Sequence, residues 1–150
     1  MITIETPAGP FTMTGDGAAV TAAVFGTELP EGWAAPGEVP EKAVDAVRAY
    51  FGGDLAALDA VPVAQHGTAY LEQCWDMLRT LDGPITYTRL AELTGRPAAV
   101  RAAAQGCARN QVALIVPCHR VLRTDGSLGG YRWGLDVKRW LLAHEAAHRA

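Results

Sequence analysis

Long apolar runs and paired cysteines are both absent from this 150-residue sequence. No hydrophobic stretch approaches the ~20 residues that a membrane-spanning helix needs. Residues 1–10 contain no basic start followed by an apolar stretch, so we expect no secretory signal. The three cysteines, Cys74, Cys107 and Cys118, form no CxxC pair. This pattern argues against a disulfide framework or a zinc ribbon, and it favours a reducing, cytoplasmic compartment.

Charged residues are also few, at 19% of the chain, but they are unevenly distributed. Residues 1–86 contain 3 basic and 12 acidic side chains, whereas residues 87–150 contain 10 basic and 4 acidic side chains. The halves therefore carry −9 and +6, which gives the net charge of −3. A basic C-terminal half is typical of a protein that contacts a polyanion, although a solvated surface with uneven charge gives the same numbers. The apolar share of 49% predicts a packed core.

The N-terminal part has the pattern of a small mixed lobe. Alternating polar and apolar residues predict β structure over residues 1–28, and a Pro/Gly-rich loop follows over residues 29–40. A helix is expected from Pro40 to the Gly52–Gly53 pair, with a linker over residues 54–67. We therefore divide the chain into an α/β lobe at 1–60 and a second lobe at 66–150.

The second lobe begins with helical patterns. Thr68 can cap a helix whose apolar positions have helical spacing, namely Leu71, Cys74, Trp75 and Leu78. A short helix over residues 87–93 and a longer one over 97–109 flank Gly95, which predicts a helix-turn-helix. The longer helix is rich in alanine, and Arg101 is its only charged residue before Arg109. Such a helix can approach a narrow DNA groove or pack closely against a neighbour, and the helix alone leaves both open.

A reactive cysteine is the clearest chemical candidate. Val112 to Val116 is an apolar run that predicts a buried strand, Pro117 ends it, and Cys118 and His119 follow. A thiol is a good nucleophile only as the thiolate, so it needs a base or a cation nearby. His119 can act through a water molecule, and Glu145 on the last helix can orient it, as in a hydrolase triad. A lone Cys–His pair is nevertheless often structural.

The sequence Pro117-Cys118-His119-Arg120-Val121 resembles the active-site motif of the O6-alkylguanine-DNA alkyltransferases. The resemblance covers roughly residues 66–147, and its other pieces occur in the family's order: Thr86-Tyr87, Leu90-Ala91, Arg101, Asn110, Gly129 to Tyr131, and Leu141 to Glu145. The N-terminal lobe matches only loosely.

The resemblance implies a role for each matching residue. Cys118 would be the alkyl acceptor, activated by a water-linked relay of His119 and Glu145. Asn110 would be the hinge between the helix-turn-helix and the active-site turn. Tyr87 would push on the target phosphate and donate a proton to the departing guanine.

Further residues would bind DNA and enclose the base. Arg101 resembles the arginine that fills the space left by a flipped nucleotide, and three small residues would face the minor groove: Ala99, Ala102 and Ala104. The pocket would be formed by Val121, Tyr131, Arg132 and Trp133, with backbone groups of Cys118 and Val121 recognising the guanine edge.

The implied activity is direct-reversal DNA repair. The protein would transfer an alkyl group, mainly methyl, from O6 of guanine, or from O4 of thymine, irreversibly to Cys118. The partner would be double-stranded DNA bound through the minor groove by a monomer, with no cofactor and no metal. The implied fold is α+β: a small N-terminal lobe with an antiparallel sheet, and a mostly helical C-terminal lobe with a winged-helix-like helix-turn-helix.

The chain departs from the family pattern at several positions. Gln111 follows the hinge asparagine where the family usually has proline, and Ala104 and Gln105 occur where glycine is common. Arg132 and Trp133 replace a serine and a smaller residue that some members have. The zinc-binding residues of some N-terminal lobes are absent.

Three other classes remain as alternatives. A non-enzymatic alkyltransferase-like protein would carry tryptophan in place of Cys118. A Cys–His hydrolase would need an oxyanion hole and a histidine distant in sequence. A helix-turn-helix regulator would show side chains suited to the major groove.

Overall fold

The computed structural model describes residues 1–149, which form two compact units. The first unit comprises Met1–Gln65, Gln111–Ile115 and the stretch that begins at Ala143. The second unit comprises His66–Asn110 and Val116–Leu142. The chain therefore passes from one unit to the other four times, and neither unit is a single continuous segment.

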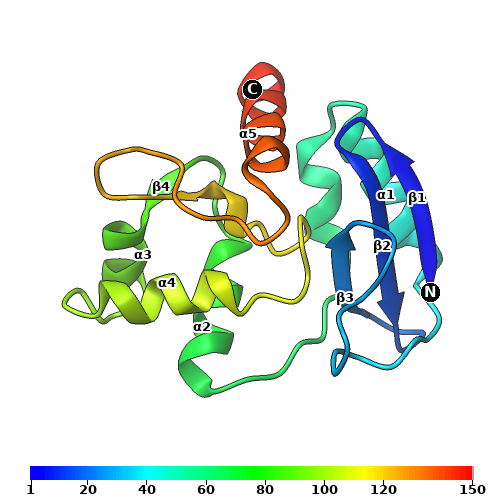
Figure 1. Cartoon of the computed structure of the whole chain (residues 1–150), viewed down its shortest axis with the longest axis horizontal. Helices are drawn as coiled ribbons and strands as arrows, with labels where there is room; N and C mark the ends of the chain where they lie inside the picture. The colour runs from blue at the N-terminus through cyan, green and yellow to red at the C-terminus, as the bar shows by residue number, and fades with distance from the viewer. Residues whose placement is uncertain (150) are drawn as a thin grey trace. The chain divides into compact units, whose positions relative to one another are not determined.

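The first unit contains a three-stranded antiparallel sheet in the order β1 (Ile2–Thr6), β2 (Gly9–Gly15) and β3 (Val20–Phe25) (Figure 1). Phe11 and Met13 are two residues apart on β2, so they lie on the same face of the sheet, and both are completely buried. Thr12 and Thr14, on the opposite face, are completely buried as well. Gly15 lies at a bulge, where a Cβ atom would approach the carbonyl oxygens of Ala19 and Glu38 to 2.5 Å each. The expected β structure over residues 1–28 is confirmed.

The expected helix after Pro40 is also present as α1 (Glu41–Phe51), and Ala43, Val47 and Tyr50 form its buried face. The chain turns immediately afterwards, where Gly53 has a φ of 110°. The segment that was expected to be an irregular linker is partly ordered, because a 3-10 helix, η1, occupies Leu55–Ala60. Leu58 is buried in this turn, which gives the segment an apolar contact with the core.

The strand expected over residues 112–116 does not form, although these residues are buried. Val112 makes only an isolated bridge to Ala23. Leu114 has a φ of 70°, a left-handed conformation that interrupts an extended strand. The Ile115 N–H then donates to the Ala113 carbonyl at 2.7 Å, so the segment turns sharply where the sequence predicted extension. An apolar run alone does not distinguish a buried turn from a buried strand.

The second unit contains the helix-turn-helix. Helix α2 (Ala69–Leu78) begins at Thr68, whose hydroxyl accepts a 3.2 Å hydrogen bond from the Leu71 N–H. Helices α3 (Tyr87–Leu93) and α4 (Val100–Ala108) follow on either side of a turn with Gly95 at a φ of 77°. The second helix begins at Val100 and not at Pro97, because the preceding residues form a turn in which the Ala99 N–H donates to the Arg96 carbonyl.

Two short parallel strands complete the second unit: β4 (Ile85–Thr86) pairs with β5 (Val121–Leu122). The last helix, α5 (Leu135–His148), begins in this unit. The mixed fold with a small antiparallel sheet and a largely helical second part is therefore as predicted. Among residues 1–149, no helix combines the length and the apolar character that crossing a membrane requires.

Helix α4 packs on α2 at Gly106, whose carbonyl accepts a 2.9 Å hydrogen bond from the Trp75 indole. Replacing a helical glycine by alanine usually stabilises a helix by about 1 kcal/mol. In Gly106→Ala, however, the new Cβ would lie 2.8 Å from Cβ and 2.9 Å from Sγ of Cys74. Overpacking of this kind costs about 1–3 kcal/mol, so we expect a lower Tm by circular dichroism.

The matched control for this substitution is Gly130→Ala, because a Cβ at Gly130 meets no atom within 4 Å. Its Tm should stay close to that of the wild type. A Gly106→Ala protein that melts at or above the wild-type temperature would show that α2 and α4 are not closely packed at this point.

Candidate active site

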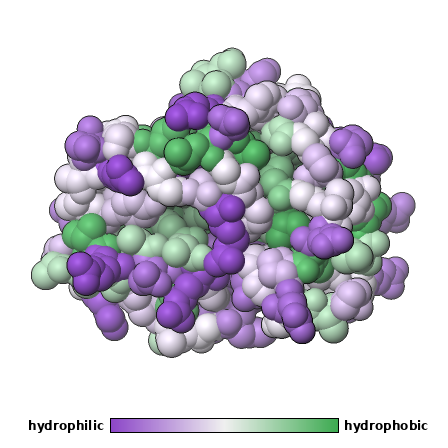
Figure 2. Space-filling view, in the orientation of Figure 1, coloured by the Kyte–Doolittle hydropathy of each residue, from purple (hydrophilic) through white to green (hydrophobic). Residues whose placement is uncertain are grey.

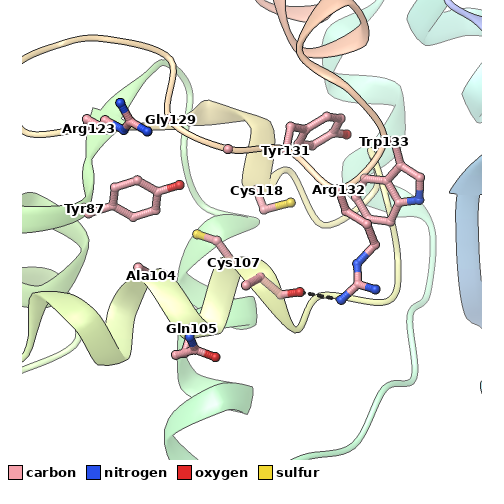
Figure 3. Close-up of a pocket in the computed structure, with 12 residues that line it drawn as sticks. Tyr87, Ala104, Gln105, Cys107, Cys118, Arg123, Gly129, Tyr131, Arg132 and Trp133 are labelled. Atoms are coloured by element: carbon pink, nitrogen blue, oxygen red, sulfur yellow. Dashed lines mark hydrogen bonds between the residues drawn. The ribbon is translucent and has the colours of Figure 1, made fainter.

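A cavity of about 540 Å³ lies in the second unit, a size typical of small-ligand sites. Its walls come from α3 (Tyr87), from α4 (Ala104, Gln105, Cys107 and Ala108), from Cys118, from Arg123 in the irregular segment that follows, and from the loop Gly129–Trp133. Figure 3 shows Cys118 in the middle of the group, with Tyr87 on one side and Trp133 on the other. The cavity therefore places the thiols of Cys118 and Cys107 between aromatic side chains.

Cys118 is positioned by a tight turn and by a single asparagine. It begins the 3-10 turn η2 (Cys118–Arg120), and its side chain is buried, with 5% of the residue exposed. Asn110, completely buried at the end of the helix-turn-helix, donates from Nδ2 to the Val116 carbonyl at 2.8 Å and to Cys118 Sγ at 3.3 Å. The same amide group thus fixes the backbone before the turn and the sulfur on it.

The electrostatic surroundings of Cys118 work in opposite directions. Burial raises the pKa of the Cys118 thiol, because the thiolate is poorly solvated in the protein interior. The hydrogen bond from Asn110 and the positive charges of Lys138 and Arg132 oppose this rise, but the pKa of the buried thiol stays above its ordinary value. Burial also raises the pKa of Cys107, and at this thiol no hydrogen bond opposes the rise. Of these two thiols in the cavity wall, Cys118 has the better support as a nucleophile.

Tyr87 contributes a phenol that keeps its proton. It is the first residue of α3, directly after Thr86, whose hydroxyl caps the helix by accepting a 3.1 Å bond from the Arg89 N–H. Burial, followed by the nearby thiols of Cys107 and Cys118, raises the pKa of Tyr87 to about 12. At neutral pH its hydroxyl is therefore protonated and able to donate a hydrogen bond into the cavity.

The residues of the expected relay lie in different units. His119 follows Cys118 in η2 and is completely buried, with its ring centre 6.4 Å from that of Tyr131. Glu145 is completely buried in the first unit, where its carboxylate accepts a 2.7 Å hydrogen bond from the Tyr50 hydroxyl. Its second oxygen lies 3.9 Å from the Arg149 guanidinium. A relay from Glu145 to His119 thus stays a prediction.

Three of the four residues expected to form the pocket line the cavity. Tyr131 and Trp133 contact each other edge to face, with ring centres 5.1 Å apart. Arg132 donates from Nη2 to the Ala108 carbonyl at 2.8 Å, which connects the loop to the C-terminal end of α4 (Figure 3). Val121 is completely buried and is not part of the cavity wall.

The residues expected to contact DNA lie along α4. Arg101 is exposed, Ala102 and Ala104 are half-buried, and Ala99 immediately precedes the helix. In Figure 2 the visible surface along α4 combines small, weakly hydrophobic residues with strongly hydrophilic ones. The small residues between the long side chains of Arg101 and Gln105 leave room for close approach to another molecule.

Several cavity residues were not predicted from the sequence, among them Gln105, Cys107, Ala108 and Arg123. Cys107 and Ala108 follow Ala104 by three and four positions, so helical spacing places them on the same face. Arg123 had no comparable signal, because it follows the motif in an irregular segment. Within residues 1–149 no group of three or more His, Cys, Asp or Glu side chains is arranged to bind a metal ion.

Comparison with known proteins agrees with this geometry. Residues 70–147 match the family described as "6-O-methylguanine DNA methyltransferase, DNA binding domain". The methylated-DNA–protein-cysteine methyltransferase of Methanosarcina acetivorans is 35% identical over 150 residues, which cover 95% of this chain and 96% of that protein. This chain belongs to the methylated-DNA–protein-cysteine methyltransferase family.

Other relatives extend beyond the matched region. The chain is 49% identical over 88 residues to the bifunctional transcriptional activator/DNA repair enzyme Ada of Escherichia coli, and it spans only 25% of that protein's length. It spans 60% of the Shigella flexneri methyltransferase, at 42% identity. The crystal structure of Mycobacterium tuberculosis OGT in complex with DNA superposes with a TM-score of 0.83 and 32% identity, covering 97% of this chain and 92% of that one. This similarity extends over both units.

The bond from Asn110 to the sulfur leads to a prediction about pH. In Asn110→Ala the thiolate loses a hydrogen bond that lowers its pKa, so we expect the pKa of Cys118 to rise. The thiolate fraction at neutral pH then falls, so we expect the reaction of the Cys118 thiol with an electrophile to slow roughly ten-fold or more. Single-turnover rates measured against pH should show the midpoint displaced to higher pH. An unchanged midpoint with a uniformly slower reaction would assign Asn110 to backbone structure alone.

Proposed function

We propose that this chain repairs alkylated DNA by direct reversal, transferring an alkyl group from O6 of guanine to Cys118 Sγ. The observation that carries this proposal is the buried Cys118 sulfur in a cavity of about 540 Å³, supported by an amide hydrogen bond from Asn110. Membership of the methyltransferase family supports the same chemistry. Methyl is the expected principal group, and O4 of thymine is a second substrate.

The proposed reaction is an in-line displacement at a saturated carbon. The Cys118 thiolate attacks the alkyl carbon, an S–C bond forms, and the bond between that carbon and O6 breaks. The electron pair of the broken bond remains on guanine, which takes up a proton supplied by the Tyr87 hydroxyl. The proton of the resting thiol leaves through the water-linked relay of His119 and Glu145. The thioether product is not hydrolysed, so each molecule reacts once.

The proposed substrate is double-stranded DNA, bound by a monomer through the minor groove. The family match is to a DNA-binding domain, and the Mycobacterium tuberculosis relative was crystallised with DNA. The small residues of α4 suit close approach to a narrow groove, and the exposed Arg101 side chain is available to fill the space of the extruded nucleotide. Extrusion costs a few kcal/mol, which a side chain inserted into the stack offsets in part.

The assignment of Cys118 is tested by intact-protein mass spectrometry after incubation with a duplex containing O6-methylguanine. We expect the wild type to gain one methyl group, located on Cys118 by peptide mapping. Cys118→Ala should gain no methyl group. It should retain most of its DNA affinity, because binding rests on contacts to the phosphate backbone of the DNA. Cys74→Ala is the control, since Cys74 lies outside the cavity. Methyl transfer to Cys74 or Cys107 in the Cys118→Ala protein would refute the assignment.

The contact between Trp133 and Tyr131 leads to a prediction about the size of the alkyl group. Trp133 occupies space in the cavity wall, and overfilling a packed site costs about 1–3 kcal/mol, or roughly ten- to a hundred-fold in rate. We therefore expect free O6-benzylguanine to react poorly with the wild type. Trp133→Gly should recover much of that rate, with little effect on O6-methylguanine in DNA. Equal benzyl rates for the two proteins would show that Trp133 does not restrict the pocket.

A further inference from the structure

A lysine is completely buried in the second unit, next to the active-site turn. Lys138 lies in the first turns of α5, and no part of it is exposed. Its Nζ donates to three carbonyl oxygens: Val121 at 2.9 Å, Leu128 at 2.5 Å and Gly130 at 3.2 Å. Buried lysines are rare because removal of the ammonium from water is costly. For Lys138 this desolvation cost is offset by hydrogen bonds from Nζ to three backbone carbonyls.

The number of acceptors indicates the protonation state of Lys138. An ammonium has three N–H donors, whereas a neutral amine has only two. The three carbonyls around Nζ match the three donors of the charged form. Because all three donors are used, Lys138 has none left for a substrate atom, and it is not a proton donor in the reaction.

The three acceptors belong to two parts of the site. Val121 is the residue after the active-site turn η2, and its backbone is among the groups proposed to recognise the guanine edge. A carbonyl oxygen has two lone pairs, so it can accept from Lys138 and from guanine together. Leu128 and Gly130 flank Gly129 in the loop that forms one wall of the cavity. One ammonium thus connects the cavity loop to the turn that presents Cys118.

We propose that Lys138 is a positioning residue for alkyl transfer: its ammonium fixes the cavity loop to the active-site turn and favours the Cys118 thiolate by its positive charge. This inference rests on the proposed role of Cys118 as the acceptor. The charge of Lys138 acts to lower the pKa of Cys118, and the Cys118 thiolate acts to raise the pKa of Lys138. Burial disfavours both the Cys118 thiolate and the Lys138 ammonium, because each is poorly solvated in the interior. The attraction between the two opposite charges offsets part of this cost.

Other titratable groups surround this pair and are present in every variant below. Tyr87 and Cys107 face Cys118 from α3 and α4, Arg132 faces it from the cavity loop, and His119 follows it in the chain. Arg123 acts on Lys138 and lowers its pKa by repulsion. A difference in Cys118 reactivity between the wild type and a residue-138 variant is therefore assigned to Lys138, because the other charged groups are the same in both proteins.

The test is the rate at which iodoacetamide alkylates Cys118 in the absence of DNA, followed over pH with peptide mapping to separate Cys118 from Cys74 and Cys107. Lys138→Met removes the charge and keeps much of the side-chain volume. We expect roughly ten-fold slower alkylation below the thiol pKa, with the rates converging at alkaline pH, where both proteins carry the thiolate. Lys138→Arg keeps the charge and should keep the wild-type pH midpoint.

The control is Arg139→Met, which removes a neighbouring positive charge from an exposed side chain paired with Asp136. Its pH profile should match that of the wild type. Hydrogen exchange of residues 123–134 should accelerate in Lys138→Met and not in Arg139→Met, because only the former loses the three carbonyl bonds. A Lys138→Met profile with the wild-type midpoint would overturn the proposal, whether or not the absolute rate falls.

A second measurement needs no variant and applies if Lys138→Met fails to fold. Methylation of Cys118 removes the thiolate permanently, so the pKa of Lys138, followed by carbon NMR of labelled lysine, should fall in the methylated protein. An unchanged pKa would overturn the electrostatic part of the proposal. Since the iodoacetamide assay uses no DNA, its outcome is independent of whether the wild type accepts methyl from O6-methylguanine.

Discussion

The geometry of the site depends on the side-chain amide of Asn110. This group is completely buried at the end of the helix-turn-helix, and one nitrogen reaches both the Val116 carbonyl and the Cys118 sulfur. A buried amide without partners would be costly, so the turn that supplies both acceptors and the helix that supplies the donor stabilise each other. The position of α4, the proposed DNA-contacting helix, and the position of the sulfur are therefore fixed by the same hydrogen-bonding group.

The chemistry of the site is a balance between burial and a few fixed polar groups. A buried thiol is a weak nucleophile unless its anion is stabilised, and the interior around Cys118 supplies one amide hydrogen bond and the charges of Lys138 and Arg132. Tyr87, under the same burial, retains its proton. Burial raises the pKa of both groups. At Cys118 a hydrogen bond and two positive charges oppose this effect, whereas at Tyr87 the opposing influence is the charge of Arg123.

The sequence predicted those features that local patterns determine. The helices at Glu41–Phe51 and Ala69–Leu78 follow from apolar spacing and from caps such as Thr68, and the motif around Cys118 gives the chemistry directly. The turn at Leu114 was missed because an apolar run does not show whether the backbone is extended. Lys138 was missed because its acceptors are carbonyls of loops, which side-chain patterns do not reveal. Its position three residues before the buried Leu141 was the available signal.

The four passages of the chain between the units have a consequence for synthesis on the ribosome. The sheet belongs to the first residues made, but β3 is bonded to a later segment: the Ala23 N–H donates to the Gln111 carbonyl at 2.9 Å. Tyr50 bonds to Glu145, a partner 95 positions further along the chain. Part of the β3 edge can pair early, because Val20 bonds to Pro62 and Ala64, but the bonds of Ala23 to Gln111 and Ala113 form only after those residues emerge. The N-terminal unit therefore cannot complete its hydrogen bonds until α5 has been synthesised.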